Sequence, residues 1–168
     1  MYETLNTFKA NSDLSSSQSL KLFRAAQSRS RLGQVWAKIS RSSNRLLDLN
    51  NTLAGLIVRG RHAAASQAVL IEKIRGTEGR LNDFDAHFNP LNEQTRDRWL
   101  SVAAARLGGA SLPAVDLIQV GEVYFVRDGH HRISVALALG EQAIDAHVTV
   151  YEVESVCSAP AGLCLQAA

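Results

Sequence analysis

Residues 124–140, YFVRDGHHRISVALALG, constrain the fold of this chain more than any other segment. Residues 123–126 are apolar on both faces of a strand, which is typical of a strand in the middle of a sheet. Residues 127–129 predict a sharp turn, and the apolar spacing of residues 131–139 predicts a helix that ends at Gly140. A central strand that leads through a turn into a helix indicates an α/β chain.

Further strand and helix patterns surround this segment. The expected elements are a short strand at 68–71, a helix from Asn92 or Thr95 to about Leu107, a strand at 112–120, a hairpin turn at Gly121-Glu122, and a strand at 143–151. The helix is expected to bury Leu100, Ala103, Ala104 and Leu107. We therefore expect a domain of the α/β (α+β) class at residues 67–153, with a small mixed sheet and flanking helices.

Residues 1–66 predict a basic helical extension. Residues 1–16 are rich in Ser, Asn and Asp without periodicity, and are expected to form a loosely held arm. Residues 20–49 predict a long amphipathic helix, broken near Gly33 and followed at 51–66 by a short helix and a loop. Its apolar stripe is expected to comprise Leu32, Trp36, Ile39, Leu46 and Leu47.

The charge of the chain is unevenly distributed. Residues 1–66 contain ten Lys and Arg against three Asp and Glu, whereas residues 67–168 contain eight against thirteen. A basic first part beside an acidic second part indicates either a polyanionic partner or docking of one part on the other. The candidates for contact with DNA phosphates are Arg24, Arg31, Lys38, Arg41 and Arg45, with an ordinary solvated helix face as the alternative.

Length and composition limit the class of protein. A chain of 168 residues, 46% of them apolar, can bury one core with a smaller appendage. No run approaches the roughly eighteen apolar residues of a membrane helix, and the start of the chain has no apolar signal core, so we expect a cytoplasmic protein with no membrane partner. Residues 154–168 predict a flexible tail in which Cys157 and Cys164 are free thiols.

The turn at residues 128–132, DGHHR, carries the chemistry. A helix start presents unpaired backbone N–H groups and a partial positive charge, which suit phosphate oxygens. Cations at a helix start oppose the helix dipole, so His130, His131 and Arg132 indicate that an anion binds there. Gly129 would let the backbone approach that ligand, and Asp128 is a candidate ligand for Mg²⁺. The alternative is an ordinary Asp-Gly turn before a helix.

This turn, with the central strand before it and the Ala-rich helix and IDAHV strand after it, resembles the N-terminal domain of ParB and its relatives. Those relatives include sulfiredoxin and the free-serine kinases. Residues 69–74 and Arg80 are similar to the first strand and arginine-bearing loop of ParB, and residues 112–115 lie where that family enters its second strand. The resemblance covers residues 68–153.

The resemblance implies that the chain binds a nucleoside triphosphate, ATP or CTP, together with Mg²⁺. By position, Gly129, His130, His131 and Arg132 would form the phosphate turn, and Arg80 would be a second cation facing the phosphates. Three departures narrow this inference. The turn lacks the cysteine of sulfiredoxin, the helix-turn-helix and dimer domains of a partition protein do not follow, and the glutamate base of the serine kinases has no assigned counterpart. Glu72, Glu78, Asp83 and Asp85 are the acids considered for that base.

Three functions remain open from the sequence. The first is a nucleotide-binding, DNA-associated protein with Mg²⁺-dependent NTPase or nuclease chemistry, in which Asp128 binds the metal and His131 or Arg132 stabilises the oxyanion. The second is a small-molecule kinase, which would need a closed polar pocket beside the turn. The third is a non-catalytic module whose N-terminal helix assembles subunits through Leu32, Trp36, Ile39 and Leu46.

Overall fold

The computed structural model describes residues 2–40 and 43–155, with side chains from Ser15 onward. In chain order the elements are α1 (Tyr2–Ser40), β1 (Leu47–Asp48), α2 (Leu49–Leu53), β2 (Leu56–Ala63), β3 (Gln67–Leu70), the 3-10 turn η1 (Ile71–Lys73), β4 (Ile74–Thr77), η2 (Glu93–Thr95), α3 (Arg96–Leu107), β5 (Val115–Val120), β6 (Val123–Asp128), α4 (His130–Ala138) and β7 (Ala143–Ser155). The predicted tail at 154–168 and its two cysteines lie almost wholly outside the described residues.

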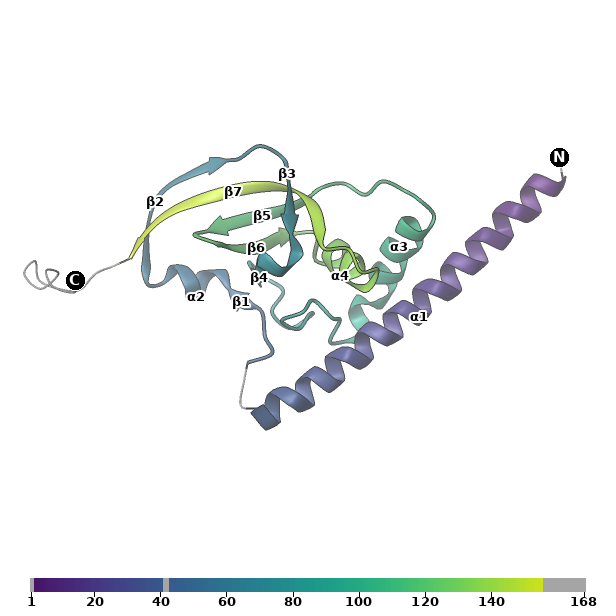
Figure 1. The fold of residues 1–168 in the computed structure, drawn as a ribbon, viewed down its shortest axis with the longest axis horizontal. Helices are drawn as coiled ribbons and strands as arrows, with labels where there is room; N and C mark the ends of the chain where they lie inside the picture. The colour runs from purple at the N-terminus through teal and green to yellow at the C-terminus, as the bar shows by residue number, and fades with distance from the viewer. Residues whose placement is uncertain (1, 41–42, 156–168) are drawn as a thin grey trace, which may run out of the picture.

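Within the described residues, seven strands form one mixed sheet, as expected of an α/β (α+β) chain (Figure 1). The strand order is β1-β4-β6-β5-β7-β2, and β3 pairs with β7 beside β2. β6 lies inside the sheet, parallel to β4 and antiparallel to β5, which agrees with its apolar sequence. Phe125 and Val126 of β6 are both fully buried, so the two faces of this strand are covered.

The two faces of the sheet carry separate cores. One core joins the sheet to α1, α3 and α4 through Phe23, Trp99, Ile133 and their neighbours. The other lies on the side of α2, where Leu49 packs with Phe125 and other side chains of the opposite face. Figure 1 shows α3 and α4 between the sheet and the long α1, whereas α2 lies near β1 and β2. The phosphate-turn candidates therefore lie at the end of β6, on the side covered by α3 and α4.

The second half of the chain follows the sequence prediction closely. The predicted helices at 92–107 and 131–139 and the hairpin turn at Gly121-Glu122 are observed, and the last strand runs on to Ser155. The expected strand at 68–71 is observed as β3, and β4, which follows it after η1, was not predicted. The helix α3 buries Ala103 as predicted, but its largest fully buried side chain is Trp99.

The first part of the chain differs more. The helix α1 already includes residues 2–14, where a loosely held arm was predicted, and it passes through Gly33 without a break. A Cβ atom on Gly33 would lie 2.9 Å from Nδ2 of Asn44. Glycine at this position therefore leaves space for the Asn44 side chain, which follows the end of the helix. Residues 56–63, predicted as a loop, form β2, because the long β7 offers them an antiparallel partner.

The face of α1 that packs on the rest of the chain is not the predicted apolar stripe. Leu32, Trp36 and Ile39 are exposed, and the buried face instead contains Phe23 and Ala26. The ring of Phe23 meets Trp99 edge to face at 5.4 Å between centroids, which fixes α1 to α3. Two sets of apolar residues recur at helical spacing in α1, one around Phe23 and one around Trp36. Of these two sets, the one around Phe23 meets an aromatic side chain of the domain, Trp99. No helix in the described part of the chain is long and apolar enough to cross a bilayer.

Candidate nucleotide-binding groove

The predicted turn forms one wall of an open groove of about 950 Å³. The groove lies between the start of α4, one edge of α3, the loop after β4, the start of β5 and the end of β6. Its charged and imidazole side chains are Arg80, Asp83, Arg98, Asp116, Asp128, His130, His131, Arg132 and His147. The structure thus brings Arg80 and all five residues of the turn to one cavity, although Arg80 is far from the turn in sequence.

Gly129 begins α4 in the left-handed region, with φ 102°. A Cβ atom at this position would lie 2.5 Å from Cγ1 of Val115, a distance that real side chains do not reach. The position therefore requires glycine both for its backbone angle and for close packing on β5. The sequence predicted that this space serves a ligand; in the structure Val115 fills it.

Arg132 is held by the protein on three sides. Its Nη1 donates hydrogen bonds to the carbonyls of Pro113 at 2.7 Å and Ala114 at 2.6 Å, and its Nη2 pairs with Asp128. The side chain is 16% exposed, whereas that of Asp128 is 70% exposed. Arg132 thus joins the segment before β5 to the start of α4. Its positive charge faces the groove but is already paired with the carboxylate of Asp128.

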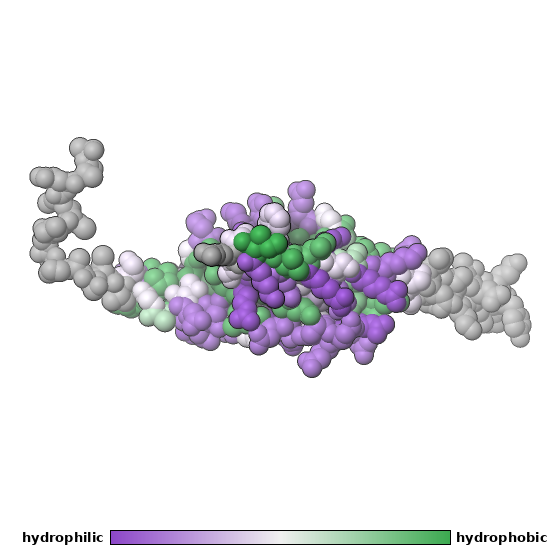
Figure 2. Space-filling view, turned by 90° about the horizontal axis from the view of Figure 1, so that it is seen from below, coloured by the Kyte–Doolittle hydropathy of each residue, from purple (hydrophilic) through white to green (hydrophobic). Residues whose placement is uncertain are grey.

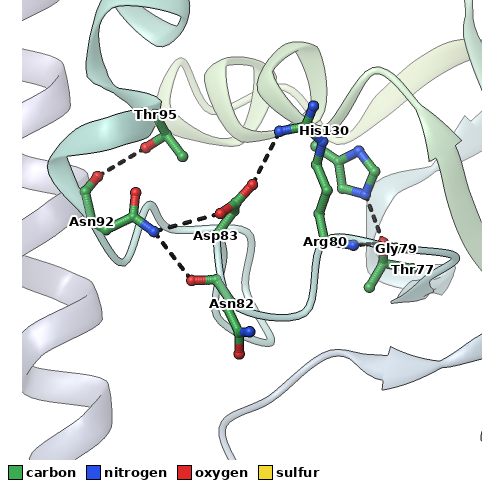
Figure 3. A network of polar contacts seen from close by, with 8 residues as sticks. All are labelled: Thr77, Gly79, Arg80, Asn82, Asp83, Asn92, Thr95 and His130. Atoms are coloured by element: carbon green, nitrogen blue, oxygen red, sulfur yellow. Dashed lines mark hydrogen bonds and ion pairs between the residues drawn. The ribbon is translucent and has the colours of Figure 1, made fainter.

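His130 is a buried, neutral imidazole. The hydroxyl oxygen of Thr77 accepts backbone N–H groups from Gly79 and Arg80, at 3.2 and 3.1 Å, so its own proton is left for Nε2 of His130, 2.7 Å away (Figure 3). The ring then carries its proton on Nδ1. Burial, assisted by the positive charge of Arg80, lowers the pKa of His130 from 6.5 to about 4. His130 therefore joins α4 to the loop after β4 and adds no positive charge at neutral pH.

Acidification should reveal this histidine as a pH-dependent loss of stability. Because the pKa of His130 is lower in the folded chain, protons bind preferentially to the unfolded chain, and stability falls as the pH drops from about 6.5 towards 4. Between pH 7.5 and 5.0 we expect His130 to account for a loss of about 2 kcal/mol.

Urea unfolding at the two pH values measures this loss. In His130→Asn, which starts from lower stability, the difference between the two pH values should shrink by about that 2 kcal/mol. His147→Asn makes the same change at an exposed side chain of β7 and serves as the matched control for the substitution itself at both pH values. An unchanged difference in His130→Asn would contradict the assignment of a buried neutral ring.

His131 faces the groove more directly. Burial is the main reason why the pKa of His131 is lowered, and the charges of Arg80 and Arg98 act in the same direction. Its Nε2 is buried and is without a hydrogen-bond partner in the described part of the chain. The rings of Phe84 and His131 pack edge to face, with centroids 5.4 Å apart. The other ring nitrogen donates a hydrogen bond to the backbone of Thr95, so in the neutral ring Nε2 is an acceptor and offers no proton to an anion in the groove.

The loop after β4 places Arg80 and Asp83 beside this histidine pair. Nη1 of Arg80 and Oδ2 of Asp83 are 3.0 Å apart, and Asp83 also accepts a hydrogen bond from Asn92 (Figure 3). The Arg80 side chain is 53% exposed, so its pair with Asp83 is open to solvent and weak. An incoming anion can therefore compete for this guanidinium.

Arg98 is a groove residue that was not predicted from the sequence. It lies on α3, one turn after Thr95, and both residues line the groove. It is exposed, and within residues 43–155 it makes no ion pair. The signal in the sequence was slight, because a surface arginine beside Arg96 looks like any solvated helix face. Of the three arginines of the groove, Arg98 alone in the described chain is without a carboxylate partner.

A row of polar side chains crosses the sheet at the same groove. Asp116 of β5 pairs in register with Asp128 of β6 on one side and with His147 of β7 on the other. Residues paired in this way project to the same face of a sheet, and all three line the groove. Asp128 was predicted from the sequence, whereas Asp116 and His147 were not, because only the strand register brings the three together.

The other acids considered for a catalytic base lie elsewhere. Glu78 pairs with Arg127, and Glu72 lines a separate cavity near η1. Asp85 is buried and accepts backbone N–H groups from His87 and Asn89, so it shapes its own loop. Asp83 is the member of that set which lines the groove.

The candidates for DNA contact lie away from the groove. Arg24, Arg31 and Lys38 are exposed on α1, and Arg45 is exposed after it. Arg41 lies outside the described residues. These side chains do not converge with the turn on one cavity.

No family model matches the chain, and no curated protein or solved structure matches it either.

Proposed function

We propose that this chain binds the polyphosphate of a nucleoside triphosphate, ATP or CTP, in the groove beside residues 128–132. One observation carries the proposal: the groove combines the open start of α4 with three arginines from three separate segments, Arg80, Arg98 and Arg132. Guanidinium groups and helix starts are the donors that phosphate oxygens prefer. The volume of about 950 Å³ is ample for a nucleotide.

The charges of the groove fit a nucleotide that carries a metal ion. Arg80 and Arg132 are each shared with a carboxylate, which leaves Arg98 and Asp116 as the charges without a partner in the described chain. Mg²⁺ is commonly held by one or two carboxylates together with substrate phosphates. Asp128 and Asp116 would hold it here, since no described group of three His, Cys, Asp or Glu residues could hold a metal alone. Bound in this way, the ion would neutralise charge on the phosphates.

The ParB/sulfiredoxin resemblance of residues 68–153 supports the same ligand, because members of that superfamily bind nucleotides at the corresponding turn. The open shape of the groove favours this reading over a small-molecule kinase, which needs an enclosed polar pocket. Of the acids considered for a kinase base, only Asp83 is within the groove, and it already pairs with Arg80. DNA contact by the basic face of α1 and hydrolysis of the nucleotide are predictions from the sequence that no feature of the groove tests.

Arg98→Ala is the sharpest test of the proposal. Loss of a charge-assisted hydrogen bond to phosphate is expected to weaken binding of Mg·ATP or Mg·CTP by about 10- to 100-fold. Isothermal titration of the full chain measures it. Arg98 is the best choice because, among the described residues, it supports no ion pair whose loss would disturb the fold.

Arg96→Ala provides the matched control. It removes the same charge from the same helix, two residues away, at a side chain that does not line the groove. Binding should stay within about twofold of wild type, since the remaining long-range effect is screened by salt. If neither nucleotide binds the wild-type chain at millimolar concentration, the proposed function is wrong. Equal losses in the two variants would place the ligand elsewhere.

A further inference from the structure

The last turns of α1 carry an exposed apolar stripe. Leu32, Val35, Trp36 and Ile39 are 71%, 58%, 70% and 69% exposed. Their spacing of three, four and seven residues puts them on one face of the helix. Figure 2 looks towards this end of the molecule and shows a hydrophobic patch there, surrounded by hydrophilic atoms. Four large apolar side chains on two helical turns form a contiguous patch, which is unusual for a surface without a partner.

The stripe faces away from the domain. Leu32 follows the buried Phe23 by nine residues, which is about two and a half turns of helix and so the opposite side. The buried face of α1, with Phe23, Ala26 and Ser30, holds the helix to the domain. The helix is therefore already formed and oriented, and a flat partner can approach the stripe without meeting the sheet.

The surroundings of the stripe are uniformly basic. The exposed cations of this part of α1 are Lys21, Arg24, Arg29, Arg31 and Lys38. Residues 15–40 contain no Asp or Glu. By helical spacing, Arg31 and Lys38 lie on one side of the stripe and Arg29 lies on the other. The occupant of this surface must offer apolar contact at its centre and negative charge around it.

A second copy of the chain fits these requirements poorly. Pairing two such helices would bring two basic surfaces together. The stripe spans eight residues, about 12 Å of helix, and its four side chains fall short of the roughly 800 Å² that each partner buries in a stable complex. A lipid surface needs no matching groove and supplies both apolar chains and phosphate charge.

We propose that the C-terminal half of α1 binds the surface of an anionic lipid bilayer, with the stripe at Leu32, Val35, Trp36 and Ile39 inserted at the level of the headgroups. The flanking lysine and arginine side chains then contact lipid phosphates. This contact needs no membrane-spanning segment, and it departs from the prediction that the chain has no membrane partner. It is independent of nucleotide binding in the groove.

The two tryptophans of the chain make a direct test possible. Trp99 is fully buried and Trp36 is 70% exposed, so a change in emission on adding vesicles reports Trp36. With vesicles of equal parts phosphatidylcholine and phosphatidylglycerol, emission of the full chain should move to shorter wavelength and the protein should sediment with the vesicles. The affinity for vesicles of phosphatidylcholine alone should be lower by roughly tenfold or more. Added salt should release the protein from the anionic vesicles.

The variant Leu32→Glu/Ile39→Glu keeps the Trp36 reporter and should abolish both signals. Because both side chains are exposed, its circular dichroism should match wild type. Ile57→Glu is the matched control: it makes the same change at an exposed residue of β2, and vesicle binding should be unchanged. Loss of binding in the control as well would overturn the assignment of the stripe.

Four other results would also overturn the proposal. The first is no binding to the anionic vesicles, and the second is equal binding to neutral ones. The third is short-wavelength emission of Trp36 before lipid is added, which would mean that protein already covers the stripe. A dimer mass would then assign the cover to a second copy, and a monomer mass would assign it to the chain itself. The fourth is a shift with duplex DNA and none with vesicles, which would assign the basic helix to nucleic acid.

Discussion

Trp99→Ala should destabilise the protein by about 3–5 kcal/mol, the range for removing a fully buried tryptophan. The side chain is inaccessible to solvent, packs edge to face on Phe23 of α1, and donates a hydrogen bond from Nε1 to Oγ of Ser134 at 2.8 Å. The variant loses all three interactions, and α1 loses its main aromatic contact with the domain. Urea unfolding measures the change in free energy, and limited proteolysis should show faster cleavage within α1.

Trp99→Phe separates packing from hydrogen bonding. It keeps most of the apolar contact with Phe23 but leaves the Ser134 hydroxyl without its donor. We expect a smaller loss, about 1–2 kcal/mol. If the alanine variant unfolds as wild type does, Trp99 does not join α1 to the domain, and the arrangement of this helix has to be revised.

Gly129→Ala should cost about 3 kcal/mol and abolish nucleotide binding. A side chain at φ 102° is strained by about 1–2 kcal/mol, and the collision with Val115 adds an overpacking cost of about 1–3 kcal/mol. Since Gly129 begins α4, relief of the collision must shift the backbone N–H groups proposed to bind phosphate. Urea unfolding and nucleotide titration on the same sample measure both effects.

Gly140→Ala isolates the contribution of backbone strain. Gly140 also has a positive φ, of 83°, but a Cβ atom there would meet nothing within 4 Å. We expect this variant to lose only about 1 kcal/mol and to bind nucleotide as wild type does. Equal effects of the two substitutions would show that packing against Val115 contributes nothing.

The second half of the fold could be predicted because its signals are local. The apolar run of β6, the turn at Gly129 and the Ala-rich helix each determine their structure within a few residues. The first half could not be predicted as well, because α1 contains two apolar spacings. Which one is buried depends on Trp99, about seventy residues further along the chain, and no helical period encodes that choice.

The candidate site divides in a similar way. The turn itself and Arg80 were found from the sequence and do line one groove. Arg98 and Asp116 were not, since an arginine on a helix and an aspartate on a strand become groove residues only through helix orientation and strand register. The roles of individual side chains also changed: Arg132 bonds to the chain itself, and His130 is neutral, so the positive charge of the groove comes chiefly from its arginines.

Two adjacent residues of α3 point in different directions: Trp99 packs against α1, and Arg98 faces the groove. Side chains packed at the density of a protein interior transmit displacement to their neighbours. A displacement of α1 at Trp99 would therefore be passed on to α3, the helix that carries Arg98. A single turn of α3 thus contacts α1 on one side and lines the groove on the other.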